Sequence, residues 1–212
     1  MKLYSYFRSS AAYRVRIALK LKGLPYDYIP VNLLKKEQKS PEYLEHNPQG
    51  LVPSLMSGEG EIIAQSVAIL EWLEETQPQP ALLPTNPLAR AQVRSLVNNI
   101  VCDVHPLCNI SITNYLRANH GVDDDGIFAW YCTWMHRGFE AVEQAITANN
   151  SQFALGNTPG LADICLVPQI YNADRFNIPM EKFPNIRRVV DNCKALEAFA
   201  EAAPEAQPDA PE

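Results

Sequence analysis

The chain has 212 residues, a length that fits one large domain or two small ones. Hydrophobic residues make up 47% and charged residues 20%, so we expect a packed globular core. The 18 basic and 24 acidic side chains give a net charge of -6, which argues against wholesale binding to nucleic acid or to an anionic membrane. No apolar run is long enough to span a bilayer, and the polar residues that soon follow Met1 leave no signal-peptide core.

The five cysteines are scattered along the chain and include no CxxC pair. This pattern is typical of reduced thiols in a cytoplasmic protein rather than of a disulfide scaffold. Cys102, His105 and Cys108 follow one another at steps of three, a spacing that could suggest a metal site. Pro106 interrupts them and a fourth ligand is not evident, so we expect no metal.

Roughly the first 76 residues alternate between short β-prone runs and segments with helical periodicity. We expect strands at 3–6, 26–31, 51–56 and 61–64, with helices at 13–24, after Ser40-Pro41 and from Ser66 onward. Pro41 suits the first position of a helix, and Pro48 soon ends it. The order β-α-β-α-β-β-α requires its first two strands to be parallel and its last two to form a hairpin. We therefore predict an α/β domain of the thioredoxin-like kind.

A proline-rich connector follows at 77–87, and its prolines make it stiff and non-helical. Beyond the connector the strand signal nearly vanishes, and apolar residues recur at steps of three and four, as on the buried face of a helix. We expect helices at about 93–107, 127–148, 161–171 and 186–200. The sequence thus predicts two domains, a thioredoxin-like domain at 1–80 and an all-α domain at 88–212.

The segment between the first strand and the first helix contains candidate residues for binding an anion. Ser9 and Ser10 stand where a helix is expected to begin, with Arg8 and Arg14 on either side. A hydroxyl in that place can donate to an anion, beside backbone N–H groups and the positive end of the helix dipole, and a thiolate there would be stabilised. The alternative is that Ser9 or Ser10 is simply an N-cap, because serine caps are common.

Two further segments are suited to a peptide ligand. Val52-Pro53 interrupts a strand edge, and with a cis peptide bond the N–H and C=O groups of Val52 would point outward; the alternative is an ordinary trans proline at a strand start. Gln65-Ser66 precedes a helix, where its donors could hold a carboxylate or merely cap the helix. Hydroxyls for a sulfur, a backbone edge for a peptide and a helix start for a carboxylate correspond to the parts of glutathione.

Longer motifs place these segments in a family. The motifs are Tyr4 to Ser10, Tyr13 to Leu19, Asn47-Pro48, Val52-Pro53, Gln65-Ser66 and Leu166-Val167-Pro168-Gln169. With them the chain closely resembles the zeta-class glutathione transferases, from Leu3 to Gln207-Pro208-Asp209. The resemblance implies the glutathione transferase architecture, glutathione as cofactor bound where the two domains meet, and a homodimer. Members of that family serve as maleylacetoacetate isomerases in aromatic amino-acid breakdown, including tyrosine degradation.

The resemblance also implies roles for individual residues. The serine that activates the sulfur matches Ser9, and Ser10 beside it is a second catalytic candidate. The glutathione contacts match Ser9, Ser10, Ala11, Arg14, Gln38, Val52, Pro53, Gln65 and Ser66 in the first domain, and His105, Asn109, Ile110 and Ser111 in the second. An arginine that meets the acidic substrate in the family matches Arg175, with Arg8 and Arg14 as further candidates.

Two positions depart from the family pattern. The third signature residue is usually cysteine and is Ala11 here, so no protein thiol can assist there. The related maleylpyruvate isomerases also lack that cysteine and, like this chain, carry a histidine at the position of His105. They favour arginines, however, where this chain has Ile110 and Ser111.

The implied reaction is cis-to-trans isomerisation of a maleyl diacid, foremost maleylacetoacetate to fumarylacetoacetate, through a glutathione thiolate adduct. Arginines would hold the substrate carboxylates and the developing enolate. The alternatives are a maleylpyruvate isomerase, a general glutathione transferase, and a non-catalytic glutathione-binding protein on the same scaffold. A diacid isomerase needs cations near the sulfur, whereas a transferase acting on apolar electrophiles does not.

Overall fold

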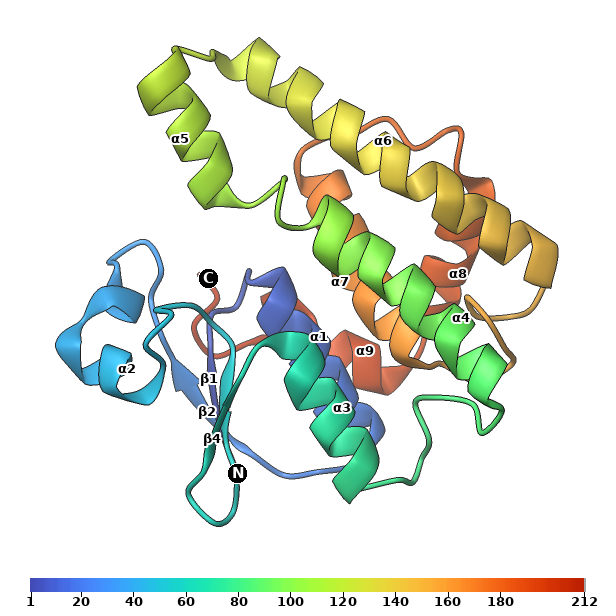
Figure 1. Ribbon diagram of the computed structural model, residues 1–212, viewed down its shortest axis with the longest axis horizontal. Helices are drawn as coiled ribbons and strands as arrows, with labels where there is room; N and C mark the ends of the chain where they lie inside the picture. Colours follow the sequence, from blue (N-terminus) through green and yellow to red (C-terminus); the bar gives the residue numbers. More distant parts are fainter. Residues whose placement is uncertain (212) are drawn as a thin grey trace. The chain divides into compact units, whose positions relative to one another are not determined.

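The computed structural model describes residues 1–211 and divides into two units (Figure 1). The first unit contains Met1–Leu82 together with the chain from Lys194 onward, and the second contains Leu83–Cys193. The second unit thus ends before the predicted boundary of the all-α domain, 88–212, because the end of the chain packs with α1 (Ser10–Leu21) in the first unit.

A four-stranded sheet forms the centre of the first unit, with β1 (Lys2–Ser5), β2 (Asp27–Pro30), β3 (Ser54–Met56) and β4 (Ile62–Ala64). The strand order is β2-β1-β3-β4. β1 pairs in parallel with β2 and antiparallel with β3, and β3 and β4 form an antiparallel hairpin. The predicted thioredoxin-like arrangement is therefore confirmed.

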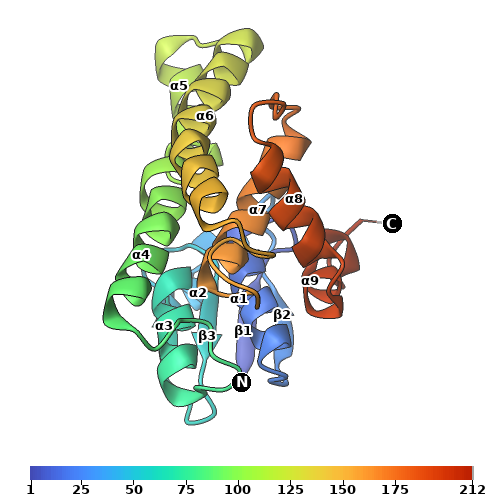
Figure 2. The same ribbon diagram turned by 90° about the vertical axis from the view of Figure 1, so that its right-hand side faces the viewer.

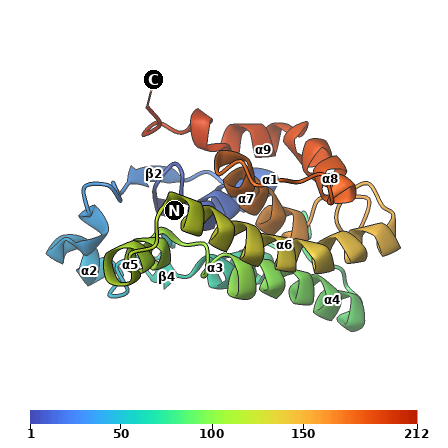
Figure 3. The same cartoon turned by 90° about the horizontal axis from the view of Figure 1, so that it is seen from above.

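Helices lie on both sides of this sheet. α1 (Ser10–Leu21) packs against α3 (Ser66–Thr76), while α2 (Pro41–His46) lies on the opposite side of the sheet, as Figures 1 and 3 show. α2 begins as predicted, because Pro41 occupies its first turn and Ser40 Oγ accepts a hydrogen bond from Tyr43 N at 3.2 Å. The short 3-10 turn η1 (Glu37–Lys39) precedes α2.

The proline-rich connector is held by a buried ion pair. Lys22 Nζ lies 3.0 Å from Glu74 Oε2 and also donates to the carbonyl oxygens of Gln77 at 2.6 Å and Pro80 at 2.9 Å. Glu74 Oε2 in turn accepts from Leu82 N at 2.9 Å. Both charged side chains are at most 8% exposed, and these additional hydrogen bonds offset the loss of hydration that burial imposes on a charge.

α9 (Glu197–Ala202) belongs to the first unit because α1 binds it. Arg16 Nε donates to Ala202 O at 2.9 Å, and Tyr13 OH donates to Phe199 O at 3.5 Å. Phe199 and Ala202 are buried in this contact. A short 3-10 turn, η3 (Pro204–Ala206), follows α9.

The second unit is helical, with α4 (Pro87–Asn98), η2 (Asn99–Val104), α5 (Ile110–His120), α6 (Asp124–Asn149), α7 (Leu161–Arg175) and α8 (Pro184–Lys194). α5 and α6 form a hairpin that Figure 2 shows from the side. Among residues 1–211, no helix is long and apolar enough to cross a membrane.

Three features of the helical part differ from the sequence prediction. The single helix expected at 93–107 ends at Asn98 and continues as η2, a π-helical turn. α6 packs on η2 at Gly138, where an added Cβ would lie 2.1 Å from Val104 Cγ2, so a side chain there would prevent this close approach. α5 was not predicted, and the helix expected at 186–200 is divided into α8 and α9.

The start of α7 is fixed by the buried carboxylate of Asp163. Its two oxygens accept from Gly160 N at 2.9 Å and from Ala154 N at 2.8 Å. Burial raises the pKa of Asp163 above its ordinary value, although these hydrogen bonds act in the opposite direction. Gly160 is the N-cap with a φ of -138°, and it lacks the side-chain oxygen that would complete a capping box.

We predict that Gly160→Ser raises the free energy of unfolding by a few tenths of a kcal/mol at about neutral pH, because serine can accept from the N–H of Asp163 in a backbone conformation open to any residue. Asp163→Ala should lower it by about 1 kcal/mol or more, since two backbone donors lose their acceptor. Urea denaturation measures both, with the exposed Asp191→Ala as control. A marked loss of stability in Gly160→Ser would show that this helix start has no room for a side chain.

Candidate active site

Ser9 is the N-cap of α1, and its hydroxyl oxygen accepts from Ala12 N at 3.2 Å. The capping alternative raised by the sequence is therefore correct as a description of the geometry. A hydroxyl can donate its own hydrogen while accepting, so capping leaves the Ser9 O–H able to bond an anion outside the helix. The helix dipole favours negative charge at the same place.

The residues next to Ser9 differ in their exposure to solvent. Ser10 is the first residue of α1 and is 6% exposed, whereas Ser9, Ala11 and Arg8 are partly exposed. The guanidinium of Arg8 lies over the Phe7 ring, 5.0 Å from its centroid. The partly exposed hydroxyl of Ser9 is better placed for a ligand than that of Ser10.

The Val52-Pro53 peptide bond is cis, the conformation that the sequence analysis left open. Val52 is 9% exposed, and the preceding carbonyl of Leu51 accepts from Tyr43 OH at 2.6 Å and from Asn47 Nδ2 at 2.8 Å. Neither Tyr43 nor Asn47 was selected from the sequence as a site residue. Asn47 stands in the Asn47-Pro48 motif, which was the available signal.

Gln38 lies against the same loop from η1. Gly50 has a φ of +60°, and an added Cβ would lie 2.8 Å from Gln38 O and 2.7 Å from Lys39 Nζ. Glycine therefore serves two needs here, a left-handed backbone and a close approach. The Oε1 atom of Gln38 is buried with no hydrogen-bond partner among residues 1–211.

The start of α3 presents Gln65 and Ser66. Gln65 has a φ of +73°, an uncommon conformation for a residue with a Cβ, and its Nε2 donates to Gln49 Oε1 at 2.6 Å. Ser66, predicted to cap this helix, is instead its first residue, and its Oγ accepts from Arg14 Nη1 at 3.3 Å. Strained backbone of this kind clusters at ligand sites.

Arg14 does not present its charge to solvent. It is 1% exposed and reaches from α1 to Ser66, so the expectation that it meets a substrate carboxylate directly does not suit its position. A long side chain pointing inward from a helix cannot be distinguished by sequence from one pointing outward. The contact with Ser66 makes Arg14 a support for the start of α3.

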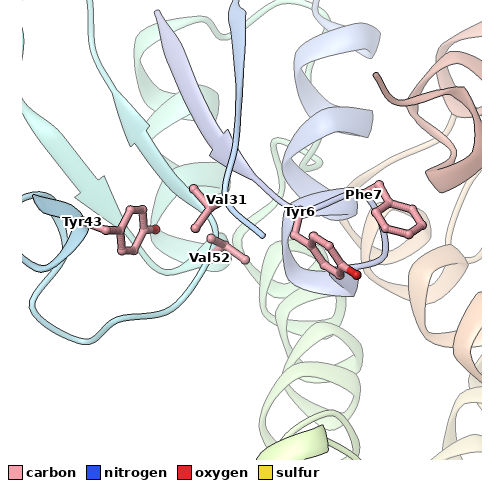
Figure 4. Packing of buried hydrophobic residues seen from close by; sticks show 5 residues of the cluster. All are labelled: Tyr6, Phe7, Val31, Tyr43 and Val52. Atoms are coloured by element: carbon pink, nitrogen blue, oxygen red, sulfur yellow. The ribbon is translucent and has the colours of Figure 1, made fainter. Parts of the chain in front are cut away.

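The first unit brings most of these residues to neighbouring segments. Val52, Tyr6 and Phe7 belong to one apolar cluster, which is completed by Val31 and Tyr43 (Figure 4). The turn before Ser9 and the cis-proline loop are thus packed in a common cluster, and Arg14 links α1 to the start of α3. Two helix amino termini with hydroxyls suit an anionic ligand such as glutathione.

In the second unit, His105 follows the π-helical turn and Asn109 caps α5. Asn109 Oδ1 accepts from the backbone N and the Oγ of Ser111, each at 2.9 Å. Trp130 Nε1 donates to Leu107 O at 2.8 Å and so fixes the segment between His105 and Asn109. Ile110 is 60% exposed.

Arg175 is exposed at the end of α7 and is oriented by aromatic rings. Its guanidinium lies over the Phe176 ring, 4.3 Å from the centroid, and Phe176 stacks on Tyr131 with centroids 4.3 Å apart. Cation–π contact restricts the orientation of a flexible arginine. The arrangement suits recognition of a carboxylate.

Three of the cysteines have thiols with raised pKa values. Burial raises the pKa of Cys108 to about 12 and also raises that of Cys132, so both remain thiols at neutral pH. Cys165 and Cys193 are buried, and Cys102 is exposed. Within residues 1–211, no group of three or more His, Cys, Asp or Glu side chains is placed to hold a metal ion.

Known proteins are similar to this chain over its whole length. Residues 8–76 match the glutathione S-transferase N-terminal domain, and residues 133–197 match the glutathione S-transferase C-terminal domain. A maleylacetoacetate isomerase of Pseudomonas aeruginosa is 49% identical over 100% of this chain and 99% of its own. A maleylpyruvate isomerase of a Ralstonia species is 46% identical over 99% of each chain.

Solved structures agree with these relatives. A bacterial maleylpyruvate isomerase, described as a zeta-class glutathione S-transferase in its holo form, has a TM-score of 0.97 and 45% identity, with 100% of each chain covered. A maleylacetoacetate isomerase of Methylobacterium extorquens, solved with bound malonate and glutathione, has a TM-score of 0.95 and 37% identity, also with 100% of each chain covered.

We predict that Gln65→Gly yields a more stable chain than Gln65→Ala by about 1 kcal/mol, because both lose the bond to Gln49 and only glycine adopts this φ without strain. The control is Ala68→Gly, an exposed helical position of α3, where glycine should cost about 1 kcal/mol. Urea denaturation without ligand gives both differences. If alanine were the better residue at both positions, the backbone at 65 would be unstrained.

Proposed function

Since the chain belongs to the zeta-class glutathione transferase and maleylacetoacetate isomerase family, we propose that it is a glutathione-dependent cis–trans isomerase of a maleyl diacid, foremost maleylacetoacetate. The observation that carries this proposal is the hydroxyl of Ser9 at the amino terminus of α1, partly exposed and fixed by its bond from Ala12 N. Full-length similarity to two isomerases supports the reaction class.

The residues of the first unit bind and orient glutathione in this proposal. Ser9 donates to the sulfur and, with the dipole of α1, favours its thiolate form. Val52 offers backbone groups to the peptide, and the start of α3 at Gln65-Ser66 receives a carboxylate. When bound, glutathione supplies a nucleophilic sulfur whose addition to the maleyl double bond makes rotation about that bond possible.

Cationic side chains recognise the diacid. Arg175, held over Phe176, binds a substrate carboxylate, and Arg8 adds positive charge beside Ser9. Such cations also stabilise the negative charge that develops on the substrate during addition. His105, Asn109, Ile110 and Ser111 complete the contacts, with Asn109 fixing the direction of the Ser111 hydroxyl.

Maleylpyruvate is the second candidate substrate. Two similarities favour maleylpyruvate. One maleylpyruvate isomerase is 46% identical in sequence, and the structure of a maleylpyruvate isomerase has a TM-score of 0.97. Exposed Ile110 and Ser111 in place of cations favour maleylacetoacetate instead. A general transferase activity and a non-catalytic binding role are the remaining alternatives.

Three further properties belong to the proposal. The enzyme acts as a homodimer, acts in the cytoplasm, and takes part in aromatic amino-acid breakdown, including that of tyrosine. The scattered cysteines without a CxxC pair support a reducing compartment, and family membership supports the dimer and the pathway.

The direct test supplies maleylacetoacetate and maleylpyruvate separately, each with and without glutathione, and compares kcat/KM for trans product. We expect turnover that requires glutathione and is faster with maleylacetoacetate. As a comparison, glutathione conjugation of an apolar electrophile is measured, because a general transferase would form a stable conjugate as its product. Conjugation without isomerisation of either diacid would contradict the proposal.

Ser9→Ala should lower kcat/KM for isomerisation by about a hundredfold or more, the size of effect seen when one donor to a developing anion is removed. Ser10→Ala should lower it by less than about tenfold, because the Ser10 side chain is buried in the first turn of α1. Circular dichroism and urea denaturation control for loss of fold, since Ser9→Ala also removes the cap. Equal kcat/KM values for the two variants would remove Ser9 from its role.

Arg175→Ala should raise KM or lower kcat for the diacid about tenfold or more and leave the affinity for glutathione nearly unchanged. Arg175→Lys should recover only part of the loss, because a point charge replaces a planar fork. Arg137→Ala is the matched control, an exposed arginine that lies over Trp134. Loss of glutathione binding with normal diacid kinetics would place Arg175 in the cofactor site.

A further inference from the structure

The turn between β1 and α1 is clamped at Phe7, two residues before Ser9. Phe7 N donates to Asp209 Oδ2 at 3.1 Å, and Phe7 O accepts from Arg16 Nη2 at 2.9 Å. Ser9 N donates to Tyr6 O at 2.9 Å, which closes the same turn. The position of Ser9 therefore depends on a backbone segment whose N–H is held by a residue 202 positions away.

Asp209 also supplies negative charge to a buried cation. Arg16 is 0% exposed, and it donates to neutral oxygens, those of Ala202, Ser5, Tyr6 and Phe7. Burial lowers the pKa of the Arg16 guanidinium, and the nearby Tyr28, Tyr26 and Tyr13 act in the opposite direction, as does the charge of Asp209 to a smaller extent. The backbone of Phe7 is therefore bonded at both of its polar groups, with the Asp209 carboxylate at its N–H and the Arg16 guanidinium at its C=O. Both charges polarise these two groups.

The segment that carries Asp209 is itself anchored on both sides. Before it, Gln207 Nε2 donates to Glu201 O at 2.9 Å and to Ala203 O at 2.8 Å. After it, Ala210 packs against the cluster that contains Phe7 and Val52. The other oxygen of Asp209 accepts from Tyr28 OH on β2 at 2.6 Å. Figure 1 shows this end of the chain returning beside the start of α1.

We propose that Asp209 is a positioning residue for catalysis: it holds the Phe7 amide so that the Ser9 hydroxyl keeps the place from which it donates to the glutathione sulfur. This inference rests on the role of Ser9 proposed above. Asp209 touches neither glutathione nor the diacid in this role. It acts through one backbone hydrogen bond and through its negative charge near Arg16.

Two substitutions separate geometry from charge. Asp209→Ala removes the acceptor and the charge, whereas Asp209→Asn keeps an oxygen that can accept from Phe7 N and removes the charge alone. Asp27→Asn is the matched control, because Asp27 is an exposed acid on β2 that does not contact the turn. All three are compared with the wild-type full-length chain.

We expect Asp209→Ala to lower kcat about ten- to a hundredfold with a much smaller change in KM for the diacid, since small displacements of a catalytic group cost this much. The pKa of glutathione bound to this variant, read from thiolate ultraviolet absorbance, should rise toward that of free glutathione. Hydrogen exchange without ligand should accelerate at residues 7–12. Asp209→Asn should fall between Asp209→Ala and wild type in all three readouts.

A purely structural role would give a different result. Variants with lower stability in urea but an unchanged pKa of bound glutathione and unchanged exchange at residues 7–12 would overturn the inference. If Asp209→Ala does not fold, the same readouts on Asp209→Asn decide. A wild-type chain that neither isomerises a maleyl diacid nor lowers the pKa of glutathione would overturn the proposed function itself, and this inference with it.

Discussion

Arg16 carries a positive charge that the fold has removed from water. A guanidinium has several N–H donors, and burying it requires acceptors in matching directions. The first unit supplies them from two places, the turn after β1 at Tyr6 and Phe7 and the end of α9 at Ala202. One side chain of α1 therefore requires both segments to be in place. This requirement explains why the end of the chain packs with the sheet rather than with the helices that precede it.

The same constraint organises the candidate site. Arg16 lies inside α1, and the turn that it holds is the turn that delivers Ser9 to the amino terminus of that helix. In the proposed function Ser9 serves folding and chemistry with different parts of one hydroxyl, since the oxygen accepts from Ala12 N while the hydrogen can be donated outward. Arg14, two residues before Arg16, supports Ser66 at the start of α3. Stability and the proposed ligand binding thus depend on a shared set of polar contacts around α1.

Local sequence patterns were enough to predict much of this arrangement. The alternation of β-prone runs and helical periodicity gave the strand and helix order, because each period reports which side chains face a core. The cap at Ser40 with Pro41 was recognisable, since these residue types have few competing local structures. The position of Ser9 at the start of α1 could be predicted in the same way. Its expected role in binding the glutathione sulfur came from the wider family motif. These features depend on residues close together in sequence.

The features that were missed depend on contacts between distant residues. α5 begins with exposed Ile110 and Ile112, so its apolar residues give no buried stripe that periodicity could detect. The π-helical turn lies where α6 approaches η2 at Gly138, and a glycine alone does not reveal which segment approaches it. Asp209 and Arg16 are 193 positions apart, yet the chain places them on either side of Phe7. A charged residue in a helical or proline-rich pattern is normally interpreted as solvated, and only the tertiary fold shows that both of these residues bond the Phe7 backbone.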